Sequence, residues 1–180
     1  MMQNKDYSVL VSEEEIKKIV RGLGARIEKD FAGRKLVVVG VLRGAFVFVA
    51  DLIRTINLPM DVEFIGVSSY QGKTSTGNVQ IKQDLSAPIA DKDVLLVEDI
   101  IDTGITVKYL LETFKQRGPK SIKTCCLLSK PSVHGSHIAI DYVGKEIGDE
   151  FVVGYGLDFN GTYRNLPFLA ELKPKSDQSI

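Results

Sequence analysis

The sequence predicts an α/β fold in which a central, mostly parallel sheet is flanked by helices on both faces. Short apolar runs of strand length alternate with longer segments whose apolar residues recur at helical spacing, and the connections between them are short. The chain has 180 residues and contains no repeat, low-complexity tract or linker. We therefore expect a single domain spanning residues 1–180.

The first half of the chain carries the signals of two helices and two strands. Ser12 with Glu15 three residues later is typical of a capped helix start, and this helix is expected to continue to about Lys29. The elements expected after it are a buried strand at residues 36–41, a mostly apolar helix at residues 45–56 that ends before Pro59, and a strand at residues 61–67.

The second half of the chain begins with a predicted strand and a predicted helix, with polar residues between them. Residues 94–97 are four consecutive apolar residues, which predicts a buried parallel strand. A helix is expected from Val107, because apolar residues at 107, 110, 111 and 114 form one helical face before Gly118-Pro119 ends it. Further strands are predicted at residues 122–128, 138–143 and 151–153.

A hydroxyl-and-glycine turn, Asp102-Thr103-Gly104-Ile105-Thr106, leads into this helix. The amino end of a helix favours an anion through its free N–H groups and the positive end of its macrodipole. Gly104 allows close backbone approach, and the hydroxyls of Thr103 and Thr106 add donors. Ligands of open α/β sheets bind at the carboxyl ends of strands, which is where this turn is expected. The turn therefore predicts a phosphate site.

Two carboxylates, Glu98 and Asp99, come between the strand and the turn. They would repel a phosphate, but they are good acceptors for a vicinal diol and good anchors for a hydrated Mg²⁺. A ribose 5-phosphate fits both features: its diol would meet the carboxylates and its phosphate would meet the turn. A Walker A loop is excluded, because there is one glycine and no Gly-Lys-Ser/Thr ending. Taken alone, Asp102 or Thr103 is a helix cap and Glu98-Asp99 a solvated strand end; the complete run 94–107 favours the ligand.

The run Val-Glu-Asp-Ile-Ile-Asp-Thr-Gly-Ile-Thr at residues 97–106 resembles the phosphoribosyl diphosphate motif of type I phosphoribosyltransferases, and closely the version in the hypoxanthine-guanine family. Further matches occur in family order and cover the chain from about residue 10 to residue 170. They are Leu42-Arg43-Gly44, Ser68-Ser69-Tyr70, Lys130-Pro131, and residues 151–160 with Arg164 after them.

The resemblance implies a purine salvage enzyme. It would displace pyrophosphate from C1 of 5-phosphoribosyl 1-diphosphate by N9 of hypoxanthine or guanine, with Mg²⁺, to give IMP or GMP. Asp102 would be the catalytic residue, as general base or acceptor on the N7 side of the purine. The family also implies a cis peptide at Leu42-Arg43, a small purine-binding hood formed mainly by the C-terminal part, and a homodimer or homotetramer.

The resemblance distributes the other residues over the substrates. Glu98 and Asp99 would bind the diol or the metal, with Asp158 as a further Mg²⁺ ligand. At Ile105 some relatives carry Lys, so this position would lend backbone contacts but no charge. The pyrophosphate would be bound by Leu42, Arg43, Gly44 and Arg164. The purine would accept a hydrogen bond from Lys130 at its 6-oxo group, stack on Phe151 and contact the backbone of Val152. The ribose phosphate would be bound by Asp102, Thr103, Gly104, Ile105 and Thr106.

Plainer interpretations stand beside these assignments. An apolar Phe151-Val152 is usually core, Arg43 could be a surface charge at a helix start, and Asp158 a turn residue. The polar segment 68–84 could be an exposed hairpin or a flexible lid that excludes water. The family favours the lid, with Ser69 and Tyr70 meeting the diphosphate.

Composition limits the function classes. Lys and Arg total 23, as do Asp and Glu, so net charge favours neither nucleic acid nor an anionic membrane as a partner. The amino terminus lacks the apolar core of a signal peptide, and no apolar run approaches the roughly 18 residues needed to span a bilayer, so we expect a cytoplasmic location. Cys125 and Cys126 are expected to be buried thiols, and His134 and His137 are expected to be loop residues.

Two alternatives to the hypoxanthine-guanine activity remain: a xanthine-guanine enzyme, and a nucleic-acid-binding regulator of the same fold.

Overall fold

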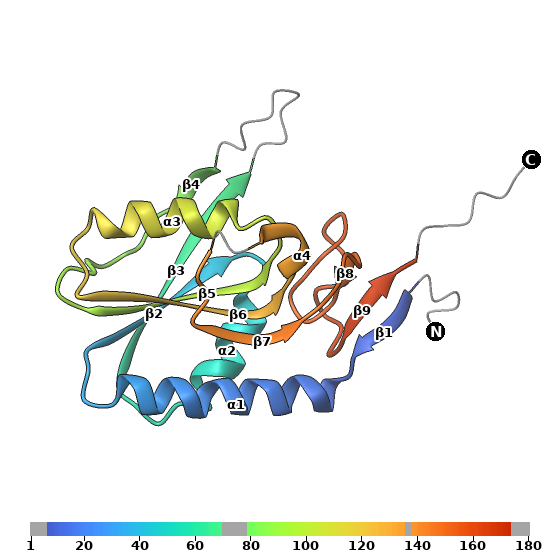
Figure 1. The fold of residues 1–180 in the computed structure, drawn as a ribbon, viewed down its shortest axis with the longest axis horizontal. Coiled ribbons are helices and arrows are strands. Elements are labelled where there is room, and N and C mark those ends of the chain that lie inside the picture. Colours follow the sequence, from blue (N-terminus) through green and yellow to red (C-terminus); the bar gives the residue numbers. More distant parts are fainter. Residues whose placement is uncertain (1–6, 70–78, 136–137, 174–180) are drawn as a thin grey trace, which may run out of the picture.

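The computed structural model describes residues 7–69, 79–135 and 138–173, which form two sheets (Figure 1). The strands are β1 (Tyr7–Val11), β2 (Leu36–Leu42), β3 (Met60–Ser69), β4 (Val79–Gln83), β5 (Asp93–Ile101), β6 (Ser121–Ser129), β7 (Tyr142–Glu146), β8 (Val152–Val153) and β9 (Leu169–Leu172). The helices are α1 (Glu13–Phe31), α2 (Phe46–Ile53), α3 (Ile105–Lys115) and α4 (Pro131–His134).

The larger sheet has the order β4-β3-β2-β5-β6-β7, and all its strands are parallel except β4, which pairs antiparallel with β3. β2 and the first half of β5 are buried on both faces, which is why their sequences are nearly continuous apolar runs. The connection from β2 goes to β3 on one side, and the chain then returns to β5 on the other side. The order reverses between β2 and β5, the usual position of a ligand site in such sheets.

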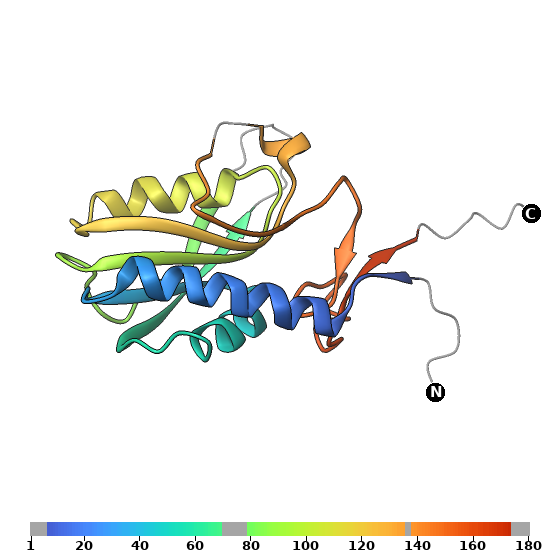
Figure 2. The ribbon, with the colours of Figure 1, turned by 60° about the horizontal axis from the view of Figure 1, so that its bottom comes forward.

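Helices cover both faces of this sheet (Figure 2). Apolar residues of α1 and α2, among them Ile27 and Phe48, form one core cluster with β2 and β5. On the other face Leu110 and Phe114 of α3 pack with Val94 and Leu96 of β5. The predicted fold class is therefore confirmed. Among the described residues, no helix is long and apolar enough to cross a bilayer.

Several predicted boundaries are wrong. The strand expected at 94–97 extends to Ile101, because its pairing with β6 continues through Ile101 opposite Ser129. Glu98 and Asp99 therefore lie inside β5 and do not follow it. α3 begins at Ile105, α2 is shorter than predicted, and the strand expected at 138–143 starts at Tyr142.

The smaller sheet forms a hood beside the carboxyl ends of the large sheet's strands, in the order β1-β9-β8 (Figure 1). Its strands are antiparallel, and β1 pairs with β9 from Tyr7 opposite Leu172 to Val11 opposite Leu169. Neither β1 nor β9 was predicted, because both are short and partly exposed, and each is stabilised by a partner from the far end of the chain.

Of the smaller predictions, some are confirmed and one is wrong. Ser12 caps α1, with the Glu15 amide donating to Ser12 Oγ at 3.2 Å. Cys125 and Cys126 are buried free thiols. His134 is not a loop residue: it is buried at the end of α4, where Nε2 lies 2.9 Å from Ser129 Oγ. His137 lies outside the described residues.

The predicted lid at 68–84 falls partly outside the described residues, which exclude 70–78 and so Tyr70. Its flanks are regular, since Ser68 and Ser69 of β3 pair with Gln80 and Val79 of β4. The hairpin flanks are thus described, and the lid itself stays a prediction.

Candidate active site

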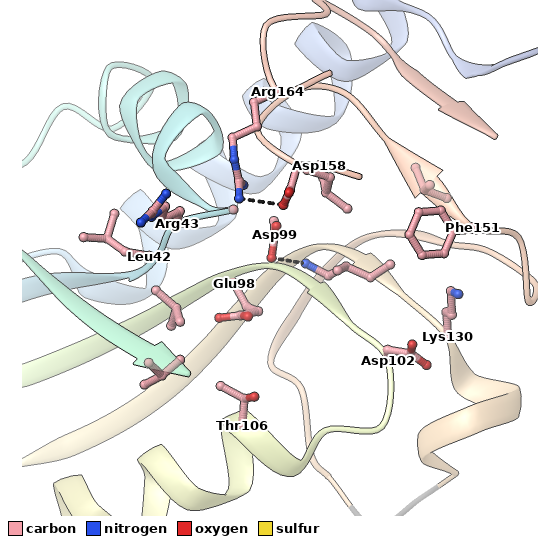
Figure 3. A pocket seen from close by; sticks show the side chains of 16 residues that line it. Leu42, Arg43, Glu98, Asp99, Asp102, Thr106, Lys130, Phe151, Asp158 and Arg164 are labelled. Carbon is pink, nitrogen blue, oxygen red and sulfur yellow. Dashed lines mark hydrogen bonds and ion pairs between the residues drawn. The ribbon is translucent and has the colours of Figure 1, made fainter. Parts of the chain in front are cut away.

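A cavity of about 360 Å³ lies where the strand order reverses, beside the carboxyl ends of β2 and β5. Figure 3 shows Leu42 and Arg43 on one side, Phe151 and Lys130 on the other, and Glu98 and Asp99 between them. The predicted site residues that line the cavity are Leu42, Arg43, Gly44, Glu98, Asp99, Asp102, Thr106, Lys130, Phe151, Val152, Asp158 and Arg164.

The turn after β2 packs directly on the acidic end of β5. The Leu42-Arg43 peptide is cis, as the family resemblance implied. A Cβ added to Gly44 would lie 1.6 Å from Asp99 Oδ2, so a side chain at this position would overlap the carboxylate. Glycine is required here because the backbone of the turn and the carboxylate occupy adjacent positions.

The two carboxylates of β5 are removed from solvent. Asp99 is 8% exposed, and its Oδ1 accepts a hydrogen bond from the Ile100 amide at 2.9 Å. Glu98 Oε2 is buried and has no hydrogen-bond partner among the described residues. Burial raises the pKa of Asp99 to about 6, and burial together with the neighbouring Asp99 raises the pKa of Glu98 well above its usual value. Neither group is the solvated strand end of the plainer interpretation.

The raised pKa of Asp99 predicts a pH-dependent cost to stability. Between pH 3.8 and about 6 the unfolded chain has released this proton while the folded protein still holds it. Stability therefore falls as pH rises through this window, by at most about 3 kcal/mol, and the cost stays constant above it. We expect Asp99→Asn to be more stable than the unsubstituted protein, without ligand, by an amount that grows from pH 4 to pH 6 and then levels off. Urea unfolding across this range measures the difference, and a constant difference would contradict it.

The turn at residues 102–106, which the sequence predicts as a phosphate site and which is called the phosphate turn below, leads directly into α3. Gly104 adopts φ 73°, in the left-handed region, and a Cβ there would lie 1.6 Å from Ile138 Cδ1. α3 begins at the next residue, so the free amides of its first turn lie next to the cavity. Asp102 and Thr106 line the cavity, whereas Thr103, Gly104 and Ile105 lie on the turn between them and are not among its lining residues. The Ile105 side chain is 48% exposed.

On the opposite side, an aromatic ring and a lysine face the cavity from different elements. Lys130 is 8% exposed, and its amide donates to the carbonyl of Ile101 at 2.9 Å, which ties the lysine to the end of β5. Phe151 is 53% exposed, so it is not core. Its ring meets Phe159 edge to face, with centroids 5.6 Å apart. Val152 is buried in β8.

Asp158 and Arg164 are brought together, a contact that the sequence did not predict. Arg164 Nη2 lies 2.5 Å from Asp158 Oδ1, and Arg164 Nη1 donates to the Gly156 carbonyl at 2.6 Å. Asp158 Oδ2 also accepts from the Gly161 amide at 2.7 Å. Arg43, by contrast, is exposed at the cavity wall.

Some lining residues were missed. They are the apolar Val41, Val67, Ile100 and Leu157, whose only sequence signal is that they adjoin or lie close to predicted site residues. Ser69 ends β3, and Tyr70 lies outside the described residues.

The carboxylates fit Mg²⁺ that is shared with a substrate. Among the described residues, no three His, Cys, Asp or Glu side chains are grouped as a complete metal cage. Mg²⁺ is usually held by one or two carboxylates together with water and phosphate oxygens, so a full cage is not needed. The unpartnered Oε2 of Glu98 and the neighbouring Asp99 would be such ligands.

Comparisons with known proteins identify the family of this chain. A family model described as the phosphoribosyl transferase domain matches residues 6–160. The chain is 47% identical over 175 residues to a hypoxanthine-guanine phosphoribosyltransferase of Staphylococcus aureus, covering 97% of this chain and 98% of the relative.

Solved structures of similar proteins have the same fold over nearly the whole chain. A hypoxanthine phosphoribosyltransferase from Staphylococcus aureus superimposes with a TM-score of 0.92 and 44% identity, covering 99% of this chain and 100% of that one. One from Trypanosoma cruzi, in complex with the product IMP, has a TM-score of 0.89 and 38% identity, covering 98% and 100%. This chain therefore belongs to the hypoxanthine-guanine branch of the phosphoribosyltransferase family.

Proposed function

We propose that this protein transfers the 5-phosphoribosyl group of 5-phosphoribosyl 1-diphosphate to N9 of hypoxanthine or guanine, forming IMP or GMP and releasing pyrophosphate. One observation carries the proposal: a single cavity is lined in spatial order by the turn after β2, the two carboxylates of β5, the phosphate turn, and a lysine with an aromatic ring. This order matches pyrophosphate, ribose diol, 5-phosphate and purine.

The reaction forms the bond from N9 to C1 and breaks the bond from C1 to the pyrophosphate oxygen. The first turn of α3 holds the 5-phosphate through its amides, and Glu98 and Asp99 accept hydrogen bonds from the ribose diol. These contacts fix C1 between the purine and the leaving group. Asp102 accepts the proton that leaves N7 as N9 bonds to C1.

Departure of pyrophosphate places several negative charges at the turn after β2. Arg43 and the amides of that turn stabilise them, and Arg164 contributes a second guanidinium at the cavity wall. Glu98 and Asp99 would hold Mg²⁺, with Asp158 at the cavity edge, and the ion would supply further neutralisation of the diphosphate. A bound Mg²⁺ would then offset the free energy that is spent on burying these carboxylates without partners.

The purine is selected by its 6-oxo group. Lys130 has a buried stem and reaches the cavity, where its ammonium can donate to an oxygen but not to the 6-amino group of adenine. Phe151, half exposed and supported by Phe159, offers a face on which the purine stacks.

Lys130→Ala is expected to erode this selection. We expect kcat/KM for hypoxanthine to fall by about 100-fold, because the variant can no longer donate to the 6-oxo group, while KM for phosphoribosyl diphosphate changes little. Steady-state kinetics with hypoxanthine and adenine measure the discrimination. An unchanged purine preference would refute the role of Lys130.

The direct test of the function is IMP formation by the purified protein from hypoxanthine and phosphoribosyl diphosphate, with and without Mg²⁺. Absence of IMP under both conditions would end the proposal. Parallel assays with guanine and xanthine separate this activity from a xanthine-guanine enzyme, and filter binding to nucleic acid across salt concentrations tests the regulator.

We further propose a cytoplasmic homodimer or homotetramer, as the family resemblance suggests. Light scattering of the purified protein measures the subunit count, and a monomeric mass at assay concentrations would contradict this assignment.

A further inference from the structure

The pyrophosphate-binding turn is in contact with the hood as well as with β5. A Cβ added to Gly156 would lie 2.2 Å from the Gly44 carbonyl oxygen. The backbone of the hood loop, residues 154–168 between β8 and β9, therefore packs directly on the turn. Gly156 has φ 103°, which suits glycine alone. Its amide donates to the Arg164 carbonyl at 3.0 Å, and its carbonyl accepts from Arg164 Nη1 at 2.6 Å. Gly156 thus presents a fixed backbone surface to Gly44.

The residue before it, Tyr155, anchors the hood loop to the large sheet's helical layer. Tyr155 is 5% exposed, and its hydroxyl donates to Asp51 Oδ2 at 2.6 Å. Asp51 lies in α2 and also pairs with Arg54. Tyr155 has φ 49°, unusual for a residue with a side chain, and its amide donates to the Leu166 carbonyl at 2.8 Å. Burial and the Asp51 carboxylate raise the pKa of Tyr155, so the hydroxyl remains a donor at neutral pH.

These contacts close a ring. From Gly44 the chain enters α2 two residues later and reaches Asp51, whose carboxylate accepts the hydrogen bond from Tyr155. The next residue, Gly156, packs on the Gly44 carbonyl and so completes the ring. Every link in this ring except the hydrogen bond from Tyr155 to Asp51 is either covalent chain or backbone packing. The Tyr155 hydroxyl and the Asp51 carboxylate are therefore the two side-chain groups whose removal opens the ring without removing a residue of the cavity wall.

We propose that Tyr155 is a positioning residue for pyrophosphate: through Asp51 it holds the hood loop against the turn at Leu42, Arg43 and Gly44 and so fixes the amides that receive the leaving group. This role rests on the proposed function and adds to it a residue that does not line the cavity. Binding of the nucleotide product does not depend on it, because in the proposed reaction IMP occupies the phosphate turn and the purine side and leaves the pyrophosphate side empty.

Tyr155→Phe isolates this contact, since the ring and its packing are kept and only the hydroxyl is lost. We expect KM for phosphoribosyl diphosphate and the dissociation constant of inorganic pyrophosphate to rise roughly fivefold to tenfold. The dissociation constant of IMP should change by no more than about twofold. Isothermal titration calorimetry with pyrophosphate and with IMP, in Mg²⁺ buffer, measures both constants without turnover.

Tyr142→Phe is the matched control. Tyr142 is 2% exposed, and its hydroxyl also donates to an aspartate at 2.6 Å, Asp30 of α1, beside a basic residue, Lys123. None of these three residues lines the cavity. The control should lose thermal stability comparable to Tyr155→Phe and leave both dissociation constants unchanged.

Asp51 provides the second set of variants. Asp51→Ala should reproduce the weakened pyrophosphate binding, the double variant with Tyr155→Phe should be no worse than either single one, and Asp51→Asn, which keeps an acceptor oxygen, should restore most of the affinity. Equal weakening of IMP and pyrophosphate, or unchanged pyrophosphate binding in Tyr155→Phe, would overturn the inference. If Tyr155→Phe weakens pyrophosphate binding as expected but the unsubstituted protein forms no IMP, the proposed function fails and the positioning role stands.

Discussion

Asp102→Asn is expected to lower kcat by about 100-fold to 10,000-fold while KM for phosphoribosyl diphosphate stays within a few-fold of its original value. Asn has nearly the same shape and can still accept a hydrogen bond, but it cannot take the proton that leaves the purine. Asp102 is exposed at the cavity and lies outside the regular part of α3, so the fold should be unaffected. Initial rates at saturating hypoxanthine, with thermal unfolding of the same samples, measure both quantities.

Asp61→Asn provides the control for this change. Asp61 lies near the start of β3, at the opposite end of the sheet from the cavity, and its exposed carboxylate pairs with Lys92 at 2.8 Å. Removing a surface pair of this kind changes stability by less than about 1 kcal/mol and should leave kcat unaltered. If Asp102→Asn lost phosphoribosyl diphosphate binding in the same proportion as kcat, Asp102 would be a binding residue and the proton transfer would need another acceptor.

Gly44→Ala is expected to abolish most of the activity, with a fall in kcat/KM of at least about 100-fold. The new methyl group would lie 1.6 Å from Asp99 Oδ2, so either the carboxylate or the turn must move. Both are parts of the proposed site, and a displacement of about 1 Å is enough for a loss of this size. Pyrophosphate and phosphoribosyl diphosphate binding should weaken together with catalysis.

Gly22→Ala is the corresponding control, since a Cβ there meets nothing within 4 Å. Gly22 lies in the middle of α1, where alanine favours the helix by about 1 kcal/mol relative to glycine, so this variant should be slightly more stable and fully active. Activity of Gly44→Ala close to that of Gly22→Ala would show that the contact between the turn and Asp99 has no functional importance.

The main sheet was predictable because strands buried on both faces are continuous apolar runs, as in β2. The end of β5 was not, because a carboxylate usually marks the end of a buried strand, and here the pairing with β6 extends past Glu98 and Asp99. β1 and β9 have no local signal strong enough to identify them. They are strands because each supplies the other's hydrogen bonds, and that pairing joins segments from opposite ends of the chain.

The candidate site was predictable where a motif is contiguous, as at 97–106, and the cavity indeed gathers most of the residues named. What could not be read from the sequence is the contact between distant segments. The packing of Gly44 on Asp99, the ion pair of Asp158 with Arg164 and the bond from Tyr155 to Asp51 depend on how the hood sits on the sheet. The burial of each side chain is set in the same way: Phe151, for which core was the plainer interpretation, is 53% exposed.

The hood sheet has a consequence for synthesis of the chain. β9 lies at the centre of that sheet, between β1 and β8, and it is the last of the described elements to leave the ribosome. A nascent chain can assemble the six-stranded sheet, and with it the phosphate turn, before β9 exists. The hood then has no central strand on which β1 and β8 can pair. Nascent chains should therefore gain the proposed ribose-phosphate half of the site first and become able to retain a purine only after β9 has emerged.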